Sequence, residues 1–280
     1  LSTGAIEEVL EEHKDVGSKS YFQNDIKYKF GQNSSLNYNT RRNRKTDWFS
    51  CDRSEGCIWN SNNTPKCRLD DKISLSNVPK VKDIETMISL LKSLGSKINF
   101  NKNKVIINNS NQLKKFASYN LVKTMRAGIL VLGPLLAKFK SAKVSLPGGC
   151  SIGTRPIDIH LKALSKLGVR YRITQGYVYA VAAKGLKGNK IRFPKISVGA
   201  TENLIIAASF AKGETILSNC AIEPEICDVI NFLNKMGCKI SWLSKRTIKI
   251  IGVKHVNDSK YSVMFDRIEA GTYLIAAAIT

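Results

Sequence analysis

Long apolar runs are missing from this 280-residue sequence. No stretch approaches the roughly 18 to 20 apolar residues that a helix needs to cross a bilayer. The first ten residues include Glu7 and Glu8, unlike the basic and apolar start of a secretory signal. Both ends look cut, since residue 1 is Leu1 and Thr280 follows directly on an apolar run. We therefore expect a cytoplasmic protein with no membrane partner.

The number and the setting of the cysteines argue against a disulfide framework. There are seven cysteines, an odd number, and no secretory signal accompanies them. The three cysteines within residues 51–67 are spaced too widely for a zinc knuckle, and no nearby histidine completes a ligand set. Cys220, Cys227 and Cys238 lie among apolar residues. We predict that these three are small buried hydrophobic side chains.

Acidic residues are half as frequent as basic ones, 22 against 44, which leaves a net charge of +22. Such an excess favours nucleic-acid binding, but most of the basic residues are lysines scattered singly, without aromatic residues between them. A solvated lysine-rich surface is the better interpretation, and we expect no nucleic-acid partner. Between Thr86 and Thr201 the only carboxylate is Asp158. This isolated acid indicates a specific hydrogen-bonding role.

The isolated acid belongs to a loop-like stretch that is dense in glycine and in reactive side chains. Residues 146–160 read LPGGCSIGTRPIDIH, after a strand-like run and at the start of a helix-like run. Glycines at this density indicate a backbone that bends freely or approaches a ligand closely. Cys150 and Arg155 make this loop a candidate chemical site. Asp158 fits either helix N-capping or a hydrogen bond to a base or sugar, and both alternatives stay open.

A supersecondary unit repeats three times along the chain. Helix-like runs end at Gly95, Gly168 and Gly237, which are 73 and 69 residues apart. Each glycine is typical of a helix C-terminal cap, and a strand-like run follows it. A second set of helices is expected at residues 121–139, 201–211 and 268–279. The pattern predicts an α/β fold built from a repeated unit.

Five linked motifs resemble those of UDP-N-acetylglucosamine 1-carboxyvinyltransferases, a group of enolpyruvyl transferases. They begin at Asn120, Leu146, Lys195, Glu223 and Asp266, and they read NLVKTMRAG, LPGGCSIGTRPIDIH, KISVGAT, EPEI and DRIEAGT. The resemblance covers about residue 71 to the end of the chain. It implies inverse α/β barrel domains, each made of three βαβαββ units, in agreement with the repeat.

The resemblance also implies domain limits. The first domain would occupy residues 71–264, with the family boundary near residue 57, and residues 265–280 would begin a second domain that is largely missing. We expect residues 1–70 to be an atypical and poorly structured region. The repeat predicts a helix at about 57–68 that the sequence does not supply, so this region is either divergent or damaged, for example by a shifted reading frame.

The activity that the resemblance implies is the first committed step of peptidoglycan synthesis. The enolpyruvyl group of phosphoenolpyruvate passes to the 3′-hydroxyl of UDP-N-acetylglucosamine, and phosphate is released; no cofactor and no metal are implied. Cys150 corresponds to the family's proton donor, which can also form a covalent adduct. A thiol with an ordinary pKa of about 8.5 is protonated at neutral pH and suits this role. Arg155 corresponds to a residue near the phosphates of both substrates, which a guanidinium fork suits.

Nucleotide-binding positions are implied in three further places. Arg126, in a turn that opens a helix, corresponds to a residue that contacts the sugar nucleotide. The uracil and ribose would be held by Pro156, Ile157, Asp158 and Ile159. A second segment would contact the nucleotide through Lys195, Ile196, Ser197 and Val198. His160 is expected only to cap or pack.

The sequence also departs from the family pattern. The early Lys-Asn pair that binds phosphoenolpyruvate has no counterpart, since Cys57 and Ile58 stand in that region. Because the rest of the second domain is absent too, we expect this chain by itself to be impaired. Two alternatives remain: a non-catalytic sugar-nucleotide binding domain, and a shikimate-pathway enolpyruvyl transferase, which the Gly-Gly-Cys loop disfavours.

Overall fold

The computed structural model describes residues 72–108, 114–117, 119–122, 125–147 and 157–279. These residues divide between two compact units. Helix α10 (Arg267–Ile279) belongs to one of them, and every described residue up to Asp266 belongs to the other. The predicted irregular region at 1–70, including the helix that the repeat predicts near 57–68, lies outside the described residues.

The larger unit contains three four-stranded sheets. Their strands, in chain order, are β1 (Lys72–Ser76), β2 (Lys97–Asn101), β3 (Lys104–Asn108), β4 (Phe116–Ala117), β5 (Ser141–Ser145), β6 (Arg170–Thr174), β7 (Tyr177–Val181), β8 (Lys190–Arg192), β9 (Glu214–Ser218), β10 (Lys239–Ser244), β11 (Thr247–Ile251) and β12 (Ser259–Ser262). The helices of this unit are α4 (Lys82–Ser93), α5 (Tyr119–Val122), η1 (Arg126–Val131, a 3-10 helix), α6 (Leu132–Phe139), α7 (Asp158–Lys166), α8 (Val198–Ala208) and α9 (Pro224–Lys235).

All three sheets have the same strand order. In the orders β4-β5-β7-β6, β8-β9-β11-β10 and β12-β1-β3-β2, the first two strands are parallel and the other neighbours are antiparallel. The second and third repeats each run βαβαββ along the chain. The predicted threefold repeat is therefore confirmed for the described residues.

The first sheet receives its parallel strand from the far end of the unit. β12 pairs with β1 so that Ile73 lies opposite Ser259 and Leu75 opposite Tyr261. The backbone N–H of Lys72 also donates to Oδ1 of Asp258 at 3.0 Å. Because the last strand completes the first sheet, the three repeats close into a ring.

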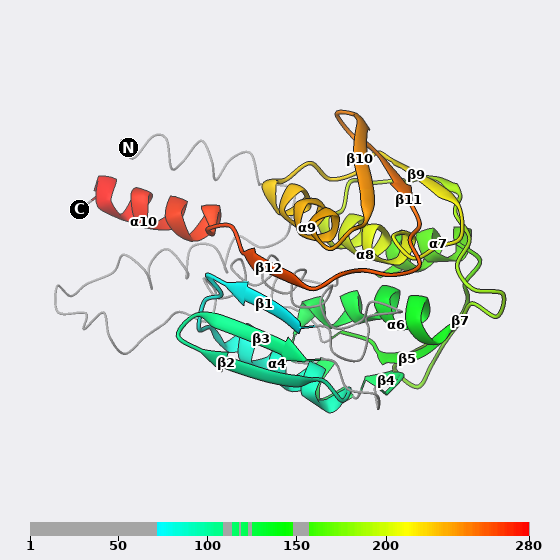
Figure 1. Ribbon diagram of the computed structural model, residues 1–280, viewed down its shortest axis with the longest axis horizontal. Helices are drawn as coiled ribbons and strands as arrows, with labels where there is room; N and C mark the ends of the chain where they lie inside the picture. The colour runs from blue at the N-terminus through cyan, green and yellow to red at the C-terminus, as the bar shows by residue number, and fades with distance from the viewer. Residues whose placement is uncertain (1–71, 109–113, 118, 123–124, 148–156, 280) are drawn as a thin grey trace, which may run out of the picture. The chain divides into compact units, whose positions relative to one another are not determined.

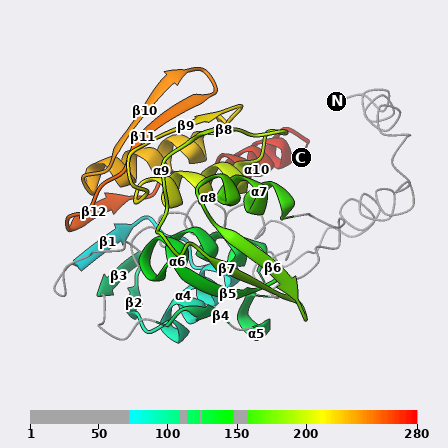
Figure 2. The ribbon, with the colours of Figure 1, turned by 90° about the vertical axis from the view of Figure 1, so that its right-hand side faces the viewer.

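The sheets lie outside and the helices inside this ring. Strands such as β3 and β11 alternate buried and exposed residues, as expected for a sheet with one solvated face. Helix α8 is buried all along residues 200–208 and contacts α6, α7, α9 and η1. Even its polar residues Thr201, Glu202 and Asn203 are buried, and a mainly apolar helix that is covered on every side belongs in the interior. Figure 1 and Figure 2 show α8 and α6 among the three sheets, which matches the predicted α/β class.

The predicted helix caps are confirmed. Gly95, Gly168 and Gly237 follow the ends of α4, α7 and α9 with φ angles of 105°, 94° and 98°. Residues with a side chain rarely adopt this left-handed backbone. Each glycine thus lets the chain leave an interior helix and enter the next outer strand.

One predicted helix was wrong in its continuity. The described residues between 121 and 139 form the end of α5, then η1 and α6, and Met125 before η1 is not helical, so they are not a single helix. Pro134 has no N–H to donate to a preceding turn, so it is tolerated in the first turn of α6 but not in the middle of a longer helix.

One of the three predicted buried cysteines was also wrong. Cys220 and Cys238 are buried, but Cys227 is exposed. The buried face of α9 contains Ile226, Val229 and Ile230, and Cys227 lies on the opposite side of the helix. Its apolar neighbours in the sequence therefore did not determine its burial.

Candidate functional site

The candidate site lies where one repeat differs from the other two. The turns from β1 to α4 and from β9 to α9 are short, residues 77–81 and 219–223. In each, an asparagine adopts a positive φ, 59° at Asn77 and 60° at Asn219. Their Nδ2 groups donate to the carbonyls of Val263 at 2.8 Å and Phe193 at 2.9 Å. These bonds tie each turn to the chain beyond the neighbouring parallel strand.

The corresponding connection of the middle repeat is longer. Its connection from β5 to α7 spans residues 146–157, more than twice the length of the other two, and Leu146 stands where they have asparagine. The backbone N–H of Leu146 donates instead to the carbonyl of Gly176 at 2.8 Å. The predicted reactive loop thus occupies the place of a tight turn in the repeat. Its central residues, with Cys150, Arg155 and Pro156, lie outside the described residues.

Asp158 is the first residue of α7. The N-cap residue is Ile157, and its side chain makes no capping hydrogen bond. The prediction that Asp158 is the N-cap residue was therefore wrong, because Asp158 lies in the first turn of the helix. Lys162 Nζ donates to Asp158 Oδ2 at 3.2 Å. This bond, together with weaker ones from the backbone, lowers the pKa of the Asp158 carboxyl. With 47% of its side chain exposed, Asp158 remains accessible to a ligand.

The second predicted segment forms the start of α8. Ser197 is the N-cap residue, and its Oγ accepts a hydrogen bond from the backbone N–H of Ala200 at 3.3 Å. Lys195 and Ile196 precede it and are exposed, and Val198 is the first helical residue. Free N–H groups at a helix start, beside a lysine, suit an anionic group such as a diphosphate. Arg126 is the first residue of η1, and the role predicted for its side chain stays a prediction.

The fold brings the starts of α7 and α8 together. His160, in the first turn of α7, is only 8% exposed. A Cβ placed on Gly199, in the first turn of α8, would lie 3.5 Å from His160 Cε1 and 3.8 Å from Nε2. The segments around Asp158 and Ser197, some 40 residues apart in the chain, are therefore neighbours across one imidazole ring.

Sequence reasoning missed the residue that holds this ring. Nδ2 of Asn203, on α8, lies 3.2 Å from His160 Nδ1 and also donates to the carbonyl of Ile129 at 3.2 Å. Oδ1 of Asn203 accepts from the backbone N–H of Gly133 at 2.9 Å. Asn203 thus joins α8 to η1, α6 and α7. The sequence did contain a signal for this role: Asn203 is an amide side chain within the mainly apolar run of residues 201–211. A polar side chain that is buried in such a run needs hydrogen-bond partners.

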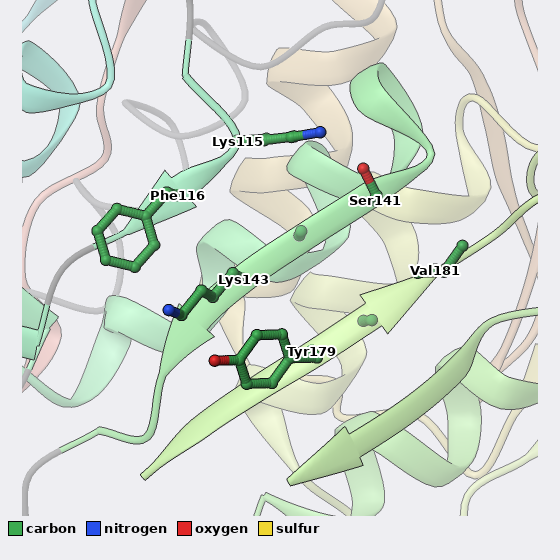
Figure 3. A pocket seen from close by; sticks show the side chains of 8 residues that line it. Lys115, Phe116, Ser141, Lys143, Tyr179 and Val181 are labelled. Atoms are coloured by element: carbon green, nitrogen blue, oxygen red, sulfur yellow. The ribbon is translucent and has the colours of Figure 1, made fainter. Parts of the chain in front are cut away.

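A separate hollow of about 370 Å³ lies on the solvent face of the sheet that contains β4, β5 and β7. Figure 3 shows Phe116, Lys143 and Tyr179 side by side there. Lys143 Nζ lies 5.0 Å from the ring centre of Phe116, 4.6 Å from that of Tyr177 and 5.1 Å from that of Tyr179. The three aromatic rings therefore already have a cation–π partner, the ammonium group of Lys143. None of the predicted nucleotide-binding residues whose side chains the structure describes lines this hollow.

The described residues contain no group of three or more His, Cys, Asp or Glu side chains that could hold a metal ion. None of their helices combines the length and the apolar composition required to cross a membrane.

Comparisons with known proteins agree with this fold. Residues 69–280 match the family model described as EPSP synthase (3-phosphoshikimate 1-carboxyvinyltransferase). An enolpyruvyl transferase from Streptomyces tendae, NikO, superposes with a TM-score of 0.71 at 16% identity, over 81% of this chain and 53% of that one. EPSP synthase from Acinetobacter baumannii gives a TM-score of 0.61, also at 16% identity, over 82% of this chain and 51% of that one. At these identities the two structures show a shared fold.

Curated relatives are more similar in sequence. A UDP-N-acetylglucosamine 1-carboxyvinyltransferase of Pelagibacter ubique is 72% identical over 209 residues, which are 75% of this chain and 50% of the relative. One of Trichlorobacter lovleyi is 53% identical over 207 residues, 74% of this chain and 49% of the relative. The chain thus spans about half the length of the curated relatives it matches. On the match of residues 69–280 and on the shared fold, the chain belongs to the EPSP synthase family of enolpyruvyl transferases.

Proposed function

We propose that this chain is the sugar-nucleotide-binding and proton-donating part of a UDP-N-acetylglucosamine 1-carboxyvinyltransferase. The observation that carries the choice of substrate is the 72% identity to a relative of that name. The geometry supports it, because α7 and α8 present the two predicted nucleotide segments side by side. Such an enzyme acts in the cytoplasm, where its product is used for cell-wall biogenesis. Through the cell wall it contributes to cell shape and cell division.

The proposed chemistry starts at the long loop of the middle repeat. Cys150 gives a proton to the methylene carbon of phosphoenolpyruvate, and the sugar's 3′-hydroxyl adds to C2 as it loses its own proton. Phosphate then leaves C2 as a proton leaves the methyl carbon, which restores the double bond in the product. Arg155 and Arg126 offset the negative charge of the substrates.

The nucleotide is held by the segments on either side of the imidazole. Pro156, Ile157, Asp158 and Ile159 hold the uracil and ribose, with the exposed carboxylate of Asp158 as a hydrogen-bond acceptor. Lys195, Ile196, Ser197 and Val198 contact the diphosphate, where the start of α8 offers backbone N–H groups.

Calorimetric titration with UDP-N-acetylglucosamine tests this proposal directly, because every nucleotide-binding position that we predict lies within these 280 residues. We expect saturable binding that Lys195→Ala weakens and that Lys184→Ala, at another exposed lysine, leaves unchanged. Cys150→Ala should still bind the nucleotide, because the thiol acts on phosphoenolpyruvate. No saturable heat from the unmodified chain would contradict the proposal.

The name of the matching family model favours one other candidate, 3-phosphoshikimate as the acceptor. Titration with shikimate 3-phosphate separates the two, since we expect no binding. A third outcome is that the chain binds the nucleotide but releases no phosphate from phosphoenolpyruvate, even when the half of a relative that this chain does not cover is added. That outcome would indicate a binding domain without catalysis. Phosphate release by the 280 residues alone would contradict our expectation that they are impaired.

A further inference from the structure

His160 is a buried titratable group that the proposed chemistry does not use. It lies two residues after Asp158 and packs against the start of α8. A histidine in the interior needs hydrogen-bond partners for its ring nitrogens. The identity of those partners determines which nitrogen carries the proton.

Asn203 settles the proton's position. Gly133 N–H is a donor, so the atom of Asn203 that faces it must be the oxygen, Oδ1. Nδ2 therefore faces His160, and one of its hydrogens points at Nδ1 while the other reaches the Ile129 carbonyl. An amide N–H requires an acceptor, so Nδ1 is unprotonated and the proton is on Nε2. The ring is a neutral imidazole of one tautomer.

This bond also fixes where the ring lies. Asn203 is anchored to the backbones of η1 and α6 at Ile129 and Gly133. The ring that it holds occupies the space between the first turn of α7 and Gly199 in the first turn of α8. An imidazole in this place keeps the two helix starts at a set distance.

We propose that neutral His160, oriented by Asn203, is a positioning residue that sets the spacing between the Asp158 segment and the Ser197 segment for one sugar nucleotide. The role rests on the proposed function, because both segments are assigned to that ligand. His160 acts through these segments rather than through contact with the reacting atoms. Its loss should therefore weaken nucleotide affinity without removing binding.

Two amide variants separate this role from simple packing. Asparagine in place of His160 puts its Oδ1 near the position of Nδ1, so Asn203 Nδ2 keeps an acceptor. Glutamine reaches toward the position of Nε2 and leaves Asn203 Nδ2 without one, although it fills more of the space. An unpaired buried donor is costly, so the helix starts should shift in the glutamine variant.

The experiment is calorimetric titration of the 280-residue chain with UDP-N-acetylglucosamine. We expect His160→Gln to bind about tenfold more weakly than the unmodified chain and His160→Asn within about threefold of it. His255→Asn, at an exposed histidine of the same unit, is the matched control and should not change the affinity. Thermal melting of each variant in the absence of ligand shows whether it is folded.

The possible outcomes distinguish the two proposals. If the unmodified chain does not bind, the proposed function fails and this role fails with it. If the unmodified chain binds and His160→Gln binds as tightly as His160→Asn, the positioning role alone is overturned. The ¹⁵N spectrum of the histidine-labelled unmodified chain is an independent check that requires no folded variant. A proton on Nδ1 of His160 would also overturn the role.

Discussion

The buried imidazole predicts how stability depends on pH. Burial lowers the pKa of His160 from its ordinary 6.5 to about 4, because the interior disfavours the charged ring, while the negative charge of Asp158 partly opposes the shift. Below pH 6.5 the unfolded chain takes up a proton at His160 that the folded chain does not. Stability therefore falls as the pH decreases from about 6.5 toward 4, and the effect levels off below that range.

The magnitude follows from the difference between the two pKa values. Between pH 7 and pH 5 the linkage amounts to about 2 kcal/mol, and over the whole interval to about 3 kcal/mol. Urea unfolding followed by circular dichroism at both pH values measures the total change. Other groups contribute to that total, so the comparison of interest is with His160→Asn, which does not titrate. The variant should lose about 2 kcal/mol less stability than the unmodified chain.

A single result would refute this reasoning. If the unmodified chain and His160→Asn lose the same stability between pH 7 and pH 5, then His160 is not held neutral by the fold. His255→Asn again serves as the control, because His255 is exposed and its removal should leave the pH dependence of the unmodified chain in place.

Two further predictions concern packing and thiol reactivity. Gly133→Ala should destabilise the chain by about 1–3 kcal/mol in urea unfolding, because its Cβ would lie 2.8 Å from the backbone oxygen of Asn203. The added Cβ of Gly199→Ala meets only ordinary contacts, so this variant should lose less stability. Equal losses of stability in the two variants would contradict the close approach of α6 and α8. In the native protein Cys227 should react with a thiol reagent much faster than Cys220, which burial protects and whose pKa burial raises to about 12. Peptide mapping by mass spectrometry measures both rates, and similar rates would show that Cys220 is accessible.

Much of this protein could be predicted because the signals are local. Gly95, Gly168 and Gly237 mark helix ends through their own backbone freedom, and the structure confirms all three. The sequence also located the long loop between β5 and α7 and singled out Asp158. Prediction was wrong where tertiary contacts decide, as at Cys227, whose side of α9 faces solvent.

Only the tertiary structure showed what surrounds these local features. Asn203 is 43 residues from His160 and 74 residues from Ile129 in the sequence. No short-range sequence pattern therefore predicts the hydrogen bonds between them. β12 completes the sheet of β1 from 186 residues away. By itself, the sequence determined the repeated unit and located the long loop that carries Cys150 and Arg155, because these depend on neighbouring residues. Which helix starts meet, and through which side chain, was decided by the closure of three repeats around the buried helix α8.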